Sequence, residues 1–410
     1  MDKETLSNYG WIVILVLVLA VMLALATPFG SFIAGAIKST TAGLFDVNQA
    51  ALGSAGINVD DLVFANCEHL ETEIRNATAD YSGDTCCKEC GKILGTGTHK
   101  VPEGGIYYVG VRYNEVGRYQ GATAVYRPGD ELPETVSFGD VYVYGDYEYR
   151  YQQYCNGTWK SDVEIVGWGV RVIDNTKTSY GEMLSSINGQ PITSLRGTFQ
   201  HCKALEIAPT LPTDGHITDM HFAFCWCENL TVAPAIPNGV IDMSSSFTDC
   251  YKLVATPNIP DTVTNLWGAF SRCTSLTTIN KLPNNTTDMC LTFNKCTALV
   301  DLSEVIIPDG IYDMQRTFQD CTSLTTAPII PSSVITLYET FKNCTSLTGT
   351  ITINTNNILS KGYTYDSQDD NSCYGCFSGV NVGNISLTGS ASKDVLNLIG
   401  STGSNWTPIS

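Results

Sequence analysis

Met314-Gln-Arg-Thr-Phe318-Gln-Asp-Cys321-Thr-Ser-Leu324 is one copy of a pattern that occurs seven times in this 410-residue chain. In every copy an apolar residue precedes a phenylalanine by four positions, a cysteine follows it by three and a leucine by six. Self-similarity at a period of roughly 20–29 residues is typical of leucine-rich-repeat solenoids. The recurring residues are Phe199, Phe224, Phe247, Phe270, Phe293, Phe318 and Phe341; Cys202, Cys227, Cys250, Cys273, Cys296, Cys321 and Cys344; and Leu205, Leu230, Leu253, Leu276, Leu299, Leu324 and Leu347.

The spacing within one copy predicts its local structure. The apolar residue, the phenylalanine and the cysteine stand at i, i+4 and i+7, which predicts one face of a short helix. The Thr-rich stretch after the leucine predicts a short strand. Pro328 and Pro331 end it, because proline cannot donate to a strand ladder. Only one such proline remains at Pro283 and at Pro308, so those two coils are expected to differ locally.

The seven repeat cysteines are interpreted as core residues. A single coil cannot bury its own apolar face, so stacked coils are expected to share one continuous core. Cysteine is small, weakly polar and usually buried, which suits one narrow position in each coil. Metal sites need clustered ligands. Disulfides between neighbouring coils are within reach at a strand spacing of roughly 5 Å, but they would strain a regular stack.

The frame M-x-x-x-F-x-x-C-t-s-L-t-t, clearest at residues 314–326 and 337–348, resembles the BspA-like leucine-rich-repeat family of bacterial surface proteins. The resemblance implies a cell-surface solenoid, often linked to adhesion and protein binding. The family has no catalytic residues that could be assigned to positions of this chain. The chain departs from the frame at Cys225-Trp226-Cys227 and in its two longer spacings, from Cys202 to Cys227 and from Cys296 to Cys321.

Charge and motif content exclude several functions. The net charge is −18 although only 16% of residues are charged. Nucleic acid is therefore excluded as a partner, because its phosphates need Lys and Arg. None of the five histidines stands in H-E-x-x-H, and neither G-x-S-x-G nor a Walker loop occurs. We expect no enzyme and no cofactor.

The N-terminus contains a long apolar run, Trp11–Ala26. Its sixteen residues approach the length of a membrane span, although Ala24-Leu-Ala26 also fits a signal-peptide cleavage site. One lysine and two acids precede the run where a signal peptide needs basic residues, which favours a retained anchor. We expect a single-pass cell-membrane protein, with the repeats at the cell surface as the family implies. A pilin-like structural subunit, assembled through the N-terminal helix, is the alternative.

Residues 56–100 contain a cysteine cluster with potential chemistry. Cys87-x-x-Cys90, together with Cys67 or His69, has the ligand types of a zinc site. Disulfides or free thiols remain the alternative, and a redox CxxC would need a βαβ context that is not evident. The pairing of Cys67, Cys86, Cys87, Cys90, Cys155, Cys373 and Cys376 stays open.

The rest of the chain predicts strands around the repeats. Val141–Tyr144 and Tyr147–Tyr151 alternate on either side of Gly145-Asp146, a strong hairpin signal. Ser179–Ile187 predicts a short helix that caps the solenoid. Further strands are predicted at Ile106–Tyr113, Ala122–Tyr126 and Val163–Ile173, and a degenerate final coil at Cys373–Phe377.

The predicted fold class is an N-terminal transmembrane helix, a small mostly-β domain and an α/β leucine-rich-repeat solenoid of about seven coils. The predicted function is binding of an extracellular protein or glycan, with adhesion as its outcome, and Trp267, Tyr312 and Tyr338 are candidate outward-facing contacts. The predicted segments are a transmembrane anchor with helical extension (1–55), a Cys-containing linker module (56–100), a β-rich domain (101–178), the solenoid (179–360) and a C-terminal cap (361–410).

Overall fold

The computed structural model describes residues 71–78, 81–88, 91–113, 119–137, 139–155, 164–358 and 373–405. The chain divides into two compact units, Met1–Lys100 and Val101–Ser410. The described part of the first unit is a three-stranded antiparallel sheet that buries Cys86 and Cys87. Its strands are β1 (Thr72–Arg75), β2 (Asp84–Cys87) and β3 (Ile93–Gly95).

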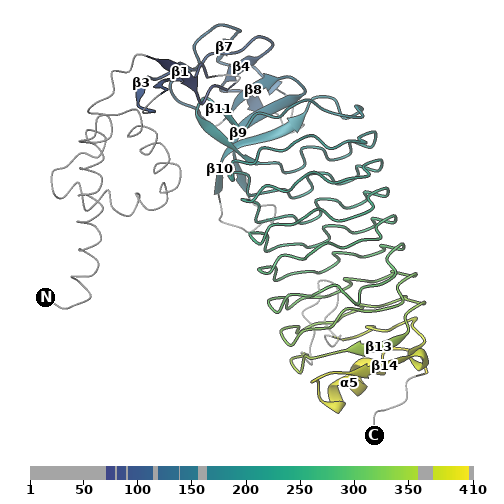
Figure 1. Ribbon diagram of the computed structural model, residues 1–410. Coiled ribbons are helices and arrows are strands. Elements are labelled where there is room, and N and C mark those ends of the chain that lie inside the picture. Colours follow the sequence, from purple (N-terminus) through teal and green to yellow (C-terminus); the bar gives the residue numbers. More distant parts are fainter. Residues whose placement is uncertain are drawn as a thin grey trace, which may run out of the picture. The chain divides into compact units, whose positions relative to one another are not determined.

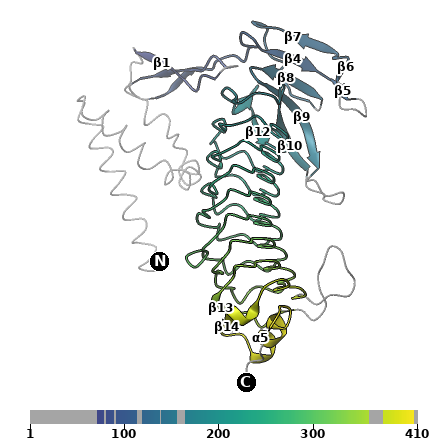
Figure 2. The ribbon, with the colours of Figure 1, turned by 90° about the vertical axis from the view of Figure 1, so that its right-hand side faces the viewer.

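The second unit begins with a seven-stranded sheet in the order β11-β12-β10-β9-β8-β4-β7 (Figure 2). The predicted hairpin is confirmed, since Tyr144 of β8 pairs with Tyr147 of β9 around Gly145 and Asp146. The strands are β4 (Ile106–Val109), β7 (Ala124–Tyr126), β8 (Asp140–Tyr144), β9 (Tyr147–Cys155), β10 (Glu164–Val172), β11 (Ser186–Ile187) and β12 (Gln190–Ser194), while β5 (Arg112–Tyr113) and β6 (Tyr119–Gln120) form a separate pair.

Two local predictions in this region are wrong. The strand predicted over Ile106–Tyr113 breaks at Gly110, whose φ of 66° does not fit a ladder. The helix predicted over Ser179–Ile187 is absent, and the segment ends in β11 instead. Tertiary contacts outweigh the local capping signal there, because the ring of Tyr180 packs 5.4 Å from the ring of Phe199.

The repeats form a stack of seven coils, which begin at Leu195, Met220, Met243, Leu266, Met289, Met314 and Leu337 (Figures 1 and 2). All the recurring Phe, Cys and Leu side chains are at most 1% exposed. Their phenylalanine rings stack with centroids 4.8 to 5.7 Å apart. Each coil donates backbone hydrogen bonds to the next, as coil 3 does at 2.8 to 3.1 Å from Met243, Ser245, Phe247 and Asp249 to the carbonyls of Asn265, Trp267, Ala269 and Ser271.

The helical face predicted within each repeat is wrong, because the segment is a run of tight turns. Ser245 has a φ of 52° and Asp249 a φ of 63°, which is the left-handed region that a type II turn requires at its third position. The amides that follow them, of Ser246 and Cys250, bond three residues back instead of four. The same two positions have positive φ in every coil, at Gly197 and His201, Phe222 and Trp226, Gly268 and Arg272, Leu291 and Lys295, Arg316 and Asp320, and Glu339 and Asn343.

Side chains also join the coils, in the direction opposite to the amides of these turns. The thiol of Cys273 donates to the Phe247 carbonyl of the preceding coil at 3.2 Å. The hydroxyl of Thr292, next to Phe293, donates to the Leu266 carbonyl at 2.9 Å. Each of these side chains supplies a hydrogen-bond donor to a buried backbone carbonyl that would otherwise be under-satisfied. The thiol contact recurs at 3.1 to 3.2 Å for Cys227, Cys250, Cys296, Cys321 and Cys344.

Both ends of the stack are covered. At the start, β12 pairs in parallel with β10 of the sheet, and Tyr147 packs against Phe199 at 6.2 Å. At the end, Phe377 of a final coil stacks 5.7 Å from Phe341, so that coil continues the phenylalanine column. The last elements are β13 (Gly349–Thr352), η1 (Val382–Asn384), β14 (Ile385–Thr388) and α5 (Lys393–Gly400).

The predicted fold class needs correction. Within the described ranges no helix combines the length and the apolar character of a membrane span. Strands and turns dominate these ranges, and α5 is their one α-helix, so neither a transmembrane helix nor α/β coils describe them. The same finding overturns the predicted single-pass membrane localisation. The apolar run Trp11–Ala26 and the extension to residue 55 lie outside the described residues.

We expect Phe270→Ala to lower the free energy of unfolding by about 3–5 kcal/mol, because it opens a cavity in the middle of the ring stack. Thr274→Ala is the matched control in the same coil, since Thr274 is exposed. An exposed position of this kind should change the free energy of unfolding only slightly. Urea unfolding followed by circular dichroism measures both, and equal losses would contradict the role of the ring column.

Candidate binding face

The segment after each repeat leucine forms a second surface of the solenoid. Its first two residues lie on a ladder between coils, with bridges such as Ile207 to Val232 and Asp301 to Thr326, and proline-containing loops follow. We call this surface, from the first residue after each leucine through the proline loop, the aliphatic face. It exposes large side chains at Ile207, Val232, Val254, Val300, Ile306 and Ile329.

Two grooves lie on the aliphatic face. The first, about 410 Å³, runs between the proline loops of coils 2 and 3, where Ala235 and Asn258 are exposed and Pro234 and Ile259 are buried. The second, about 480 Å³, spans coils 5 to 7. Its lining includes the aliphatic side chains Val305, Ile306, Ile307 and Ile329 and the polar Ser303, Asp309, Ser332, Asn354 and Ser390.

The second groove results from two extra residues in coil 5. Leu299 and Met314 are two positions further apart than Leu324 and Leu337 of the next coil. The longer loop leaves Ile306 82% exposed, beside Ile329 at 56%. Isolated exposed aliphatic residues are ordinary, but two of them in one groove form a contiguous apolar patch, which is typical of an interaction site.

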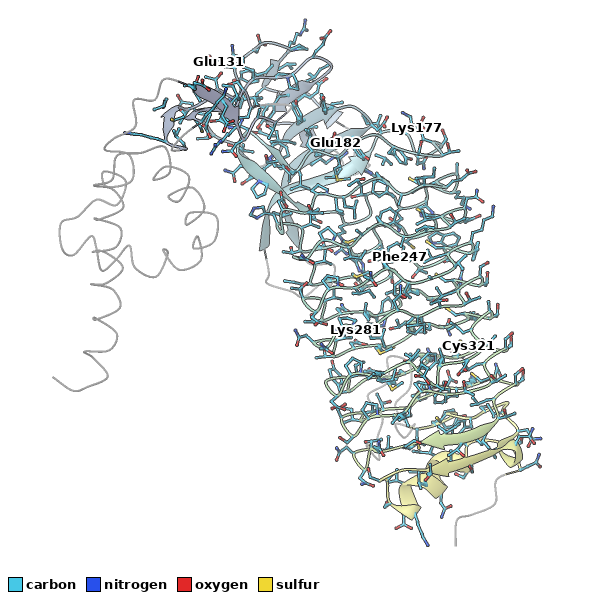
Figure 3. All side chains as sticks on the ribbon, viewed as in Figure 1. Glu131, Lys177, Glu182, Phe247, Lys281 and Cys321 are labelled. Atoms are coloured by element: carbon cyan, nitrogen blue, oxygen red, sulfur yellow. The ribbon has the colours of Figure 1, made fainter. Side chains whose placement is uncertain are left out.

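The charged residues of the aliphatic face are mainly acidic. Glu206, Asp301 and Glu304 are exposed beside its apolar side chains, and Asp309 lines the second groove. Lys281 is the lysine of this face, and it pairs with Asp261 at 3.3 Å. Figure 3 shows Lys281 toward one flank of the stack and Cys321 toward the other. The face therefore combines apolar grooves with a negative rim.

The turn runs, from the first apolar residue to the leucine of each repeat, carry other cations of the solenoid, but acids neutralise many of them. Lys203 pairs with Glu228 at 2.7 Å, and Arg272 with Asp249 at 2.6 Å. Both cations also lie over the ring of Trp226, at 5.5 and 5.7 Å. This aromatic ring is thus engaged by its own neighbours, which makes the turn runs a weaker candidate than the aliphatic face.

The candidate residues from the sequence have different positions. The recurring Phe, Cys and Leu side chains lie in the core, where no ligand reaches them. Tyr312 is 43% exposed as expected, whereas Tyr338 is only 7% exposed, since it packs between Arg316 and Tyr374. Reasoning from the repeat missed Ile306 and Ile329, although the longer spacing marked the coil that exposes the first of them.

The cysteine chemistry is only partly visible. Cys87 is buried in β2, while Cys67, His69 and Cys90 lie outside the described residues, so the zinc hypothesis stays a prediction. Across the described ranges no cluster of three His, Cys, Asp or Glu residues is placed to hold a metal ion. Cys373 and Cys376 are buried, and burial raises the pKa of both thiols.

His221 and Ser244 form a histidine–serine contact between coils 2 and 3, from Nδ1 to Oγ. Burial lowers the pKa of His221 to about 4, so the imidazole is neutral at pH 7. Ser244 is only 4% exposed. A serine at this depth cannot meet a substrate, so we assign the contact to packing between coils and not to catalysis.

A column of acids precedes the turn runs. Its members cap the amide two residues on, as Asp313 accepts from the Gln315 amide at 2.8 Å. Burial raises the pKa of Asp219 and Asp288, and it raises the pKa of Asp313 to about 6. Asn265 occupies the same position in coil 4 and makes the same cap without a charge. The cap therefore has a structural role, and the negative charge of a buried carboxylate at this position destabilises the fold.

We expect Asp313→Asn to stabilise the protein at pH 7.5 by roughly 1–3 kcal/mol, because it removes a buried charge and keeps the cap. The pKa of the folded state, about 6, is above that of the unfolded state. The wild-type carboxyl therefore loses its stabilisation as pH rises from about 4 to about 6. The difference in the free energy of unfolding between Asp313→Asn and the wild type should therefore increase over this pH range. Thermal unfolding at several pH values measures it, and a difference that does not change with pH would count against this assignment.

Comparison with known proteins supports the repeat assignment. The sequence pattern of the family described as BspA type Leucine rich repeat region matches in six copies, over residues 196–314 and 241–368. The predicted resemblance is confirmed. No curated protein matches the chain significantly. The fold search finds a T. pallidum leucine rich repeat protein (19% identity, TM-score 0.30, 46% of this chain and 78% of that one) and one from Bacteroides ovatus ATCC 8483 (16%, 0.23, 60% and 90%).

Proposed function

Since residues 196–368 form a BspA-type leucine-rich repeat region, we propose that this chain is a scaffold that binds another protein through the aliphatic face. The observation that carries the proposal is the groove of coils 5 to 7, where Ile306 and Ile329 are exposed side by side in one lining. Repeats of this type are typically protein-binding and non-enzymatic.

The chemistry of the face favours a polypeptide over a glycan. Glycans are usually held by exposed aromatic rings together with polar groups, and the large exposed side chains of this face are Ile and Val. Burying one such side chain contributes about 1.5–3 kcal/mol. An aliphatic patch with an acidic rim suits a protein segment that carries aliphatic and basic residues. Adhesion would follow if such a segment belongs to another cell.

The pilin-like alternative has no support in the described residues. It rests on an N-terminal helix within residues 1–55, which lie outside them. Further elements follow the stack at both ends, with Tyr147 of the sheet against Phe199 at the start and α5, which buries Leu396 and Ile399, after the final coil, so end-to-end growth of the coils is not favoured.

We expect the double change Ile306→Ser and Ile329→Ser to abolish peptide binding without loss of stability, because both side chains are exposed. The measurement is selection of a displayed random-peptide library on the wild-type protein, followed by titration of the selected peptides. Ile241→Ser is the matched control, as Ile241 is 49% exposed but lies outside the aliphatic face. Selection of no binder, or of binders that tolerate the double change, would refute the proposal.

A further inference from the structure

We propose that the two grooves act together and bind one extended polypeptide that runs along the solenoid axis, with two aliphatic anchors about six residues apart and basic residues at its flanks. This inference rests on the proposed function and adds the spacing and charge of the partner. The first anchor occupies the groove of coils 2 and 3, and the second occupies the groove of coils 5 to 7.

The spacing follows from the stack. The centres of the grooves are between three and four coils apart, and neighbouring coils are separated by roughly 5 Å, so the anchors lie about 17–20 Å apart. An extended chain advances about 3.3 Å per residue, so six residues span this distance. Side chains of an extended chain alternate between its faces, and an even interval places both anchors toward the solenoid.

Coil 4 separates the grooves with a polar ridge. Lys281 and Asn284 both contact Asp261, and Asn284 donates to it through its backbone at 2.8 Å and its side chain at 3.0 Å. Lys281 and Asn284 are exposed here, so the proline loop of coil 4 presents polar side chains between the two apolar grooves. The middle of the bound segment is therefore expected to be polar at this loop.

Charge selects this occupant over a second copy of the chain. Asp309 lines the second groove, and Glu304 and Asp301 are exposed on the same face. Lys or Arg beside the second anchor meets these acids with complementary charge, and Lys or Arg beyond the first anchor meets the exposed Glu206 of coil 1. A second copy would bring a net charge of −18 against the same rim, which opposes self-association.

The test uses the full chain and synthetic fluorescent peptides that carry two isoleucines, a Ser/Gln spacer of varied length and two lysines at each end. Fluorescence anisotropy should give the tightest binding when the isoleucines stand six residues apart. A peptide with one isoleucine should bind about ten- to a hundredfold more weakly, as expected for one lost aliphatic anchor. Replacing the lysines by glutamates should weaken binding further, and salt should reduce the difference.

Variants separate the two grooves. Ala235→Gln obstructs the first groove and Ile306→Ser weakens the second. Each should remove the preference for six residues and leave the affinity of the one-isoleucine peptide for the intact groove unchanged. Ile241→Ser should leave the whole profile as in the wild type. Circular dichroism verifies that each variant keeps its fold.

The outcomes distinguish this inference from the proposed function. Binding that depends on Ile306 but not on isoleucine spacing overturns the two-anchor arrangement and leaves the proposed function in place. Absence of binding by every peptide, together with failure of the library selection, overturns both. A wild-type dimer in sedimentation that Ile306→Ser dissociates would make a second copy the occupant, and that also overturns the inference.

Discussion

Two residues with positive φ in each repeat determine how this protein is built. In an ordinary helix, the amides between Met243 and Leu253 would bond within their own segment. The left-handed conformation of Ser245 and Asp249 turns several of them toward the next coil instead. Such a conformation costs roughly 1–2 kcal/mol for a residue other than glycine. The gain is a ladder that joins neighbouring coils and holds the phenylalanine column in register.

The period, the core and the hairpin could be predicted from the sequence because each has a simple pattern. Phe, Cys and Leu recur at fixed intervals, and Tyr144 and Tyr147 flank a two-residue turn. The prediction of a helix in each repeat was wrong because an apolar spacing of i, i+4 and i+7 also fits consecutive turns whose apolar residues point inward. The side chains of residues such as Trp226 and Arg316 do not predict a positive φ. The sequence indicates these positions only by the residues that are absent from them, since Val, Ile and Thr never occupy them in the seven coils.

The binding face was harder to predict than the core. The longer spacing after Cys296 indicates that coil 5 is enlarged, but it does not say which side chain the longer loop turns outward. Ile306 and Ile307 are neighbours of equal hydrophobicity, and only the first is exposed. The choice depends on how the loops of coils 5 to 7 pack together. Tyr338 shows the same limit, because its burial depends on contacts with Arg316 and Tyr374 on either side.

The ladder between coils also has a mechanical consequence. Its hydrogen bonds run along the axis of the stack, and each coil of a solenoid contacts mainly its two neighbours. A pulling force applied between the two ends therefore loads these boundaries in series, and the weakest one opens first. Each coil that is freed adds a similar length of extended chain, because the repeats differ in length by only two residues. Under tension such a protein lengthens in discrete and nearly equal steps, while the coils that remain stacked keep their grooves.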